Sequence, residues 1–129
     1  MKTHECLLLL ALGALFWVAG TIWYEFRGPL VFETTQPRYW VNFVATPVVT
    51  AAVCILILRW RQIPLSSWST AGLLIAIPGM IGEAILLARF SALMPRMQAA
   101  TAGKYGAFLF ATYALFLAIA EAATLRAGR

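Results

Sequence analysis

Four long apolar stretches constrain the fold of this chain more than any other feature. They occupy residues 7–24, 40–58, 70–88 and 105–125, and each is close to the roughly 20 residues that cross a bilayer as a helix. Only 12% of the residues are charged, about half the share of a soluble domain. The sequence therefore predicts an all-α membrane protein: residues 1–129 form a single domain of four antiparallel transmembrane helices in a compact bundle.

The positive charges do not indicate an orientation. Lysine and arginine normally favour the cytoplasmic side, but here each side of the bundle carries five. One side has Lys2, Arg59, Arg61, Arg126 and Arg129, and the other has Arg27, Arg38, Arg89, Arg96 and Lys104. This balance leaves open a dual topology with antiparallel pairing, or a fixed topology set by other features. We expect the chain to contact the lipid bilayer and, in addition, either further copies of itself or another membrane protein. Scattered charges do not form a nucleic-acid surface.

Small residues recur on one face of two helices. In the third stretch they are Gly72, Ala76 and Gly79, followed by Glu83; in the fourth they are Ala107, Ala111, Ala114 and Ala118, followed by Glu121. Membrane helices associate through close contact of small residues, so both faces are predicted to be packing faces. Their expected partners are the glycines of the first helix and the polar side of the second. This polar side of the second helix either forms packing contacts within the bundle or lines a narrow cavity.

Glu83 is an ionisable residue about 7 Å inside the end of its helix. A charge at this depth is costly, which makes it a candidate functional site. By depth, the polar groups within its reach are Thr21, Asn42, Thr46 and Tyr113. Among neutral donors a buried carboxyl is expected to stay protonated. It then acts either as a structural hydrogen-bond donor or as a site that exchanges protons or binds a cation.

Pro78 and Gly79 lie near the middle of the third stretch, one turn before Glu83. Proline removes a backbone donor inside a helix. Such positions are either helix breaks that expose backbone groups to substrate or simple kinks; we favour the kink.

Near the opposite interface, Glu121 is expected to pair with Arg59. The segments 25–38 and 89–104 are expected to be connections in the headgroup region that cover the mouth of the bundle. One histidine and two distant cysteines indicate no metal site and no cofactor, and no catalytic residues can be named.

Several short motifs resemble a family of proteins. They are TIWYEFRGPLVF, AIPGMIGEAILL, ALMPRM and GKYGAFLFATYALFLA, with Arg27 and Gly28, Pro78, Gly79, Met80 and Glu83, and Gly106 and Ala107 as the matching residues. The chain is similar in these to small bacterial four-helix integral membrane proteins classed as a domain of unknown function. The resemblance implies the fold and a bacterial cytoplasmic (inner) membrane location, but no activity. The family's acidic residue is more often aspartate, so Glu83 departs in length and not in charge.

Three functions remain open. The first is a small proton- or cation-linked transport or permeation unit that uses Glu83. The second is a non-catalytic accessory or structural subunit of a larger membrane complex. The third is a membrane enzyme for a lipid or isoprenoid-like substrate, with Glu83 as general acid. It lacks an identifiable second catalytic group, so we favour a protein that is not an enzyme.

Overall fold

The computed structural model describes residues 1–128, and among these it contains helices and turns but no strand. Two short 3₁₀ turns and one short helix join the four long helices. In chain order the elements are α1 (Thr3–Phe32), α2 (Gln36–Trp60), η1 (Leu65–Ser67), α3 (Trp68–Ala88), α4 (Phe90–Leu93), η2 (Ala99–Thr101) and α5 (Ala102–Arg126).

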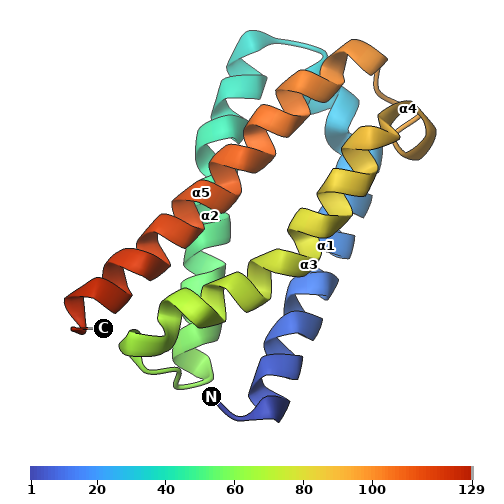
Figure 1. Ribbon diagram of the computed structural model, residues 1–129. Coiled ribbons are helices and arrows are strands. Elements are labelled where there is room, and N and C mark those ends of the chain that lie inside the picture. Colours follow the sequence, from blue (N-terminus) through green and yellow to red (C-terminus); the bar gives the residue numbers. More distant parts are fainter. Residues whose placement is uncertain (129) are drawn as a thin grey trace.

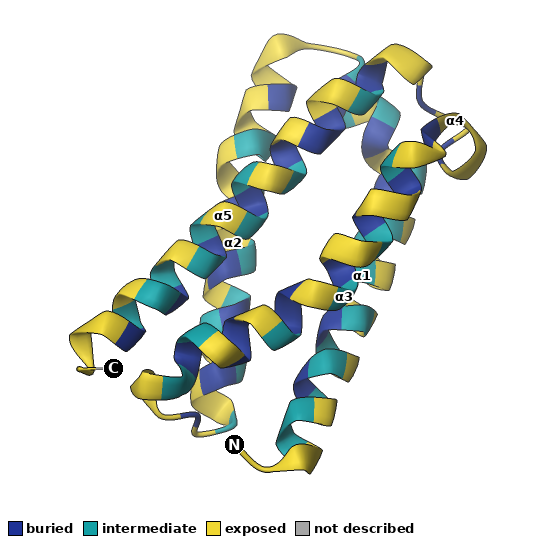
Figure 2. Ribbon diagram, in the orientation of Figure 1, coloured by how far each residue is buried: buried dark blue, intermediate teal, exposed yellow. Residues whose placement is uncertain are grey.

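The four long helices are apolar and long enough to cross a membrane. Buried residues face the interior of the bundle and exposed residues face outward on every helix (Figure 2). The outward residues are themselves large and apolar, for example Leu15, Val44, Ile81 and Phe110. An apolar exterior around an apolar interior is the pattern of a bundle that lipid surrounds, and it confirms the predicted fold class.

Consecutive long helices run antiparallel, and the N-terminus lies at the same end of the bundle as the end of α5 (Figure 1). The strongest contacts do not follow the chain order. Helix α1 packs mainly on α3, α3 also packs on α5, and α5 packs on α2. Although α1 and α2 are joined by a short turn, they touch each other little. The bundle therefore has a weak seam between its first two helices.

The small-residue face of α3 is buried, as predicted: Gly72, Ala76, Gly79 and Glu83 all lie inside. A β-carbon on Gly72 would lie 3.2 Å from the β-carbon of Ala120 and 3.4 Å from the ring of Phe116. On α1, a β-carbon at Gly13 would collide with the backbone carbonyl of Ile75. Close approach of backbones thus joins α1 to α3.

The prediction that the alanines of α5 form its packing face is wrong. Ala107, Ala114 and Ala118 are exposed, and Ala111 is half-buried. The buried face consists instead of Tyr105, Gly106, Phe108, Thr112, Phe116, Ala120 and Thr124. Large rings on α5 fit against the small residues of α3 and bury more surface than two facing rows of small residues.

The predicted connection at residues 25–38 is also mostly helical. Helix α1 continues through Pro29 to Phe32, and Glu33 closes its end by donating its backbone N–H to the Pro29 carbonyl at 3.0 Å. The helix persists because its last turns are packed: Gly28 contacts Met97, and Phe32 is buried in an aromatic cluster. At about 1.5 Å per residue, 30 residues extend about 45 Å, which exceeds the hydrocarbon core.

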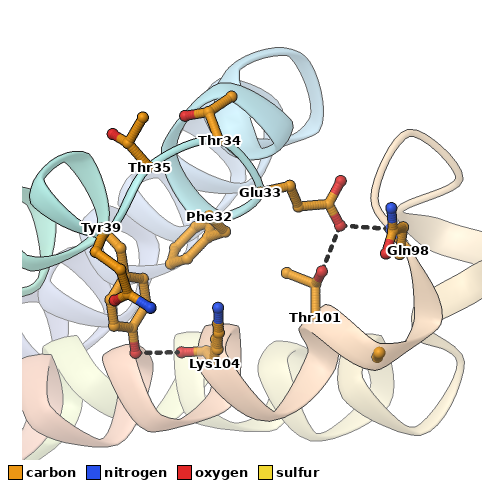
Figure 3. A pocket seen from close by; sticks show the side chains of 10 residues that line it. Phe32, Glu33, Thr34, Thr35, Tyr39, Gln98, Thr101 and Lys104 are labelled. Carbon is orange, nitrogen blue, oxygen red and sulfur yellow. Dashed lines mark hydrogen bonds between the residues drawn. The ribbon is translucent and has the colours of Figure 1, made fainter.

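The second predicted connection folds over this end of the bundle. Its own residues Phe90, Met94 and Met97 are buried against the bundle. The Glu33 carboxylate accepts hydrogen bonds from the backbone N–H of Gln98 at 2.6 Å and from the Thr101 hydroxyl (Figure 3). A carboxylate at the start of α5 also interacts favourably with the helix dipole. Glu33 thus fastens the two connections together.

An ion pair stabilises the opposite end. Arg61 donates two hydrogen bonds to the Glu5 carboxylate, at 2.9 and 2.8 Å, and this contact raises the pKa of Arg61. Nearby, Glu121 accepts a hydrogen bond from the Ser69 hydroxyl. The pairing of Glu121 with Arg59 stays a prediction.

Replacing Gly13 by alanine tests the close contact of α1 with α3. The added methyl group has to displace the Ile75 backbone, so Gly13→Ala is expected to destabilise the bundle by about 1–3 kcal/mol. The matched control is Gly20→Ala on the same helix, where a β-carbon meets nothing within 4 Å and helix propensity favours alanine. The measurement is thermal unfolding in detergent, followed by size-exclusion chromatography. Equal stability of the two variants would contradict the contact.

Removing the Glu33 carboxylate tests the fastening of the two connections. Glu33→Ala leaves the Gln98 N–H without its acceptor and is expected to cost about 1 kcal/mol. Hydrogen exchange should then accelerate in residues 98–104 and stay unchanged in the middle of α3. Gln36→Ala, an exposed neighbour on the same turn, serves as the control. Unchanged exchange at residues 98–104 in Glu33→Ala would show that the carboxylate does not stabilise the contact between the two connections.

Candidate functional site

A cavity of about 410 Å³ lies between the four long helices. Helix α1 contributes Trp17, Thr21 and Tyr24, and α3 contributes Ile75, Ala76 and Glu83. Helix α2 lines another side with its polar face, and α5 supplies mainly aromatic residues. The volume is within the range of sites for small molecules.

The structure brings together all five polar residues that the sequence singled out. Glu83, Thr21, Asn42, Thr46 and Tyr113 line this one cavity. Glu83 is the most buried of them, with only 7% of its surface exposed. The other four are half-buried.

Several polar atoms in the cavity lack a hydrogen-bond partner. They are Trp17 Nε1, Thr21 Oγ1, Asn42 Nδ2 and Glu83 Oε2. Buried polar groups in proteins are almost always paired with protein or with water. Four unpaired groups facing one space indicate a site that water or a ligand fills.

Tyr24 organises the polar side of α2 and was not predicted as a site residue. Its hydroxyl donates to Asn42 Oδ1 at 2.8 Å, and the Thr46 hydroxyl donates to the same oxygen at 2.9 Å. These bonds use the Asn42 oxygen and leave its amide N–H group free to face the cavity. Near the interface, tyrosine is read as a headgroup anchor, so the sequence carried no signal for this role.

Trp17 is a second residue that the sequence did not indicate. A β-carbon on Gly82 would lie 2.5 Å from its indole ring, so the ring packs on α3 directly beside Glu83. The indole N–H lies near the Glu83 carboxyl but does not form a well-directed hydrogen bond with it. Gly79 similarly leaves room for the hydroxyl of Tyr113. Glycines of α3 thus bring two polar aromatic side chains to the acid.

Helix α3 is continuous from Trp68 to Ala88 with Pro78 inside it, and its axis bends near the middle (Figure 1). Pro78 and Gly79 therefore form a kink and do not interrupt the helix, as proline does where neighbours support it. The bend lies one turn before Glu83.

An aromatic cluster separates the cavity from the capped end. Tyr24, Tyr105 and Phe108 face the cavity, whereas Phe32 and Tyr39 face a polar pocket of about 320 Å³ under the two connections (Figure 3). The rings of Phe32 and Tyr24 lie 5.5 Å apart, a normal distance for packed rings. The cluster thus closes this route to Glu83.

A surface groove lies along the weak seam. This groove, between the end of α1 and the start of α2, contains Leu30, Val41 and Ala45. Asn42 and Thr46 line both this groove and the cavity. The polar interior therefore approaches the lipid-facing surface between the two helices.

The cavity has one acidic side chain, a polar side on α2, and aromatic residues on α1 and α5. The described residues that line it include no arginine, lysine, histidine or aspartate. No group of three or more histidine, cysteine, aspartate or glutamate residues that could hold a metal was found in the described part of the chain.

Comparison with known proteins gives a family but no activity. A protein-family model described as "Family of unknown function (DUF5367)" matches residues 31–125. This segment contains Glu83, Asn42, Thr46 and Tyr113, whereas Arg27 and Gly28 precede it. No curated protein and no solved structure matches the chain. Because the model covers well over half of the sequence, the chain belongs to this family of unknown function.

Proposed function

We propose that this protein is a small proton-linked transport unit in which Glu83 exchanges a proton for a cationic substrate. The observation that carries the proposal is the position of Glu83. The carboxyl is buried at membrane depth, faces a 410 Å³ cavity, and has one oxygen without a partner. A carboxyl that served only to hold helices together would use its oxygens in hydrogen bonds across a helix contact.

The surroundings of Glu83 suit both states of an exchanging carboxyl. Without a cationic neighbour in the cavity, the neutral acid is the state that an apolar site accommodates. When the proton leaves, the N–H groups of Trp17 and Asn42 are unpaired donors facing the same space and can stabilise the negative charge. A bound cation supplies the remaining compensation.

An accessory role in a larger membrane complex is the second candidate. The exposed alanines of α5, Ala107, Ala114 and Ala118, present a surface on which another helix can approach closely. This helix belongs either to a second copy of the chain or to a different membrane protein. A bacterial cytoplasmic membrane, as the resemblance implies, is the proposed location for either role.

Proton movement in proteoliposomes tests the transport role. Vesicles with an acidic lumen and a trapped pH-sensitive dye receive external Na⁺, K⁺ or an organic ammonium ion. At least one cation is expected to dissipate the pH gradient faster than in protein-free vesicles. Glu83→Gln, which cannot release a proton, is expected to abolish this difference.

Glu25→Gln is the matched control, because Glu25 is a half-buried carboxyl on α1 that does not line the cavity. It should retain the flux. The transport role is excluded if no cation dissipates the gradient, or if folded Glu83→Gln transports as well as the unaltered protein. Co-purification of a stoichiometric larger partner with an inactive isolated chain would favour the accessory role.

A further inference from the structure

We infer that the substrate of this cavity is a monovalent organic cation with aromatic or other apolar substituents. The inference rests on the proposed function and specifies its substrate class. Three independent features of the cavity lead to it: its aromatic lining residues, the polar groups that it offers to a ligand, and the route by which a ligand can enter.

The wall is aromatic. Phe16, Trp17, Tyr24, Phe108, Tyr113 and Phe116 line the cavity. The faces of aromatic rings attract cations, and they do so more strongly where water is excluded. The same rings provide apolar contact for the body of an organic ligand. Because Glu83 is the acidic side chain in this lining, one positive charge on the ligand matches the site.

The donor set does not suit a bare inorganic cation. Hard cations such as Ca²⁺ require several oxygen ligands at short distances. In this cavity Asn42 Oδ1 already accepts hydrogen bonds from Tyr24 and Thr46. Of the four unpaired groups in the cavity, those of Trp17 and Asn42 are N–H donors. The two oxygens, Thr21 Oγ1 and Glu83 Oε2, are too few for such a shell. An organic cation spreads its charge and needs no complete oxygen shell.

The access route suits a molecule that partitions into the membrane. The end of the bundle nearest Glu83 is covered by the two connections and closed by the ring cluster. Between α1 and α2, by contrast, the outer groove shares Asn42 and Thr46 with the cavity. A lipophilic cation can therefore enter from the bilayer and meet polar groups before it reaches Glu83.

Exchange requires that cation and proton compete for one carboxylate. The cation binds the ionised form, so affinity is expected to rise with pH and each bound cation to displace a proton. The other titratable groups that face the cavity are Tyr24 on α1, Cys54 on α2, and Tyr105 and Tyr113 on α5. All four are neutral when protonated, so none competes with Glu83 for the cation's charge.

Equilibrium binding of tetraphenylphosphonium tests the inference. The radiolabelled cation is dialysed against the full-length protein in nanodiscs, with empty nanodiscs subtracted, at pH 6 and pH 8. We expect saturable binding that is tighter at pH 8. Glu83→Gln should weaken binding at pH 8 by about thirtyfold or more, as expected for loss of one partner of a buried charge pair. Glu25→Gln should bind as the unaltered protein does.

Competition in the unaltered protein tests the charge requirement without any variant. Phenyltrimethylammonium is expected to displace the label, whereas tert-butylbenzene, which has the same shape without the charge, is not. Displacement by Na⁺ at similar concentrations, equal displacement by the neutral compound, or absence of saturable binding would each overturn the inference. If binding is absent but an inorganic cation still moves protons through Glu83, the proposed function survives and the substrate class is wrong. If binding is confirmed but no cation moves protons, the cavity does bind organic cations and the proposed transport function is wrong.

Discussion

The small-residue face of α3 is the feature on which the rest of the bundle depends. Lipid provides no hydrophobic drive for helices to associate, so contact has to come from close packing. Gly13 of α1 reaches the backbone of α3 at Ile75, and Phe116 of α5 packs over Gly72. Helix α3 thereby holds α1 on one side and α5 on another, while α2 is held mainly by α5. The chain order of the helices does not determine which of them pack together.

This arrangement explains why a cavity exists. Because α1 and α2 are each anchored elsewhere, little packing closes the space between them. The polar residues of α2 then face inward without meeting α1 closely, and the Tyr24 hydroxyl bridges part of the gap to Asn42. Glycines next to Glu83 admit Trp17 and Tyr113. Small residues of α3 therefore both bring helices into contact, at Gly72, and shape the surroundings of the acid, at Gly79 and Gly82.

The depth of a residue along its helix could be predicted from the sequence. Which side of the helix is buried could be predicted only in part. Counting residues from the helix ends placed Thr21, Asn42, Thr46 and Tyr113 at the level of Glu83, and all of them line one cavity. The spacing of small residues identified the buried face of α3 correctly. The same rule failed for α5, because burial of large rings against glycines outweighed the regular spacing of its alanines.

The errors at the helix ends have a similar cause. Arg27 and Pro29 are residues that usually mark the end of a membrane helix, yet α1 continues to Phe32. What extends it is tertiary contact with Met97 and with the rings of Tyr39 and Tyr105, which no local pattern contains. Trp17 was missed for the same reason, since its position beside Glu83 depends on Gly82 in a distant helix.

The weak seam between α1 and α2 has a consequence for how a ligand could reach Glu83. Helix α1 lies mostly before the family segment, which begins at residue 31, yet it supplies Trp17 and Thr21 to the cavity. Its firm attachment is to α3, the helix that carries Glu83. Opening along the seam therefore separates α2 from α1 while the acid keeps its neighbours Trp17 and Gly82. Regions with few packed contacts open at the lowest cost in free energy. Here the loosely packed seam borders the one groove, among the pockets described, that shares polar residues with the cavity.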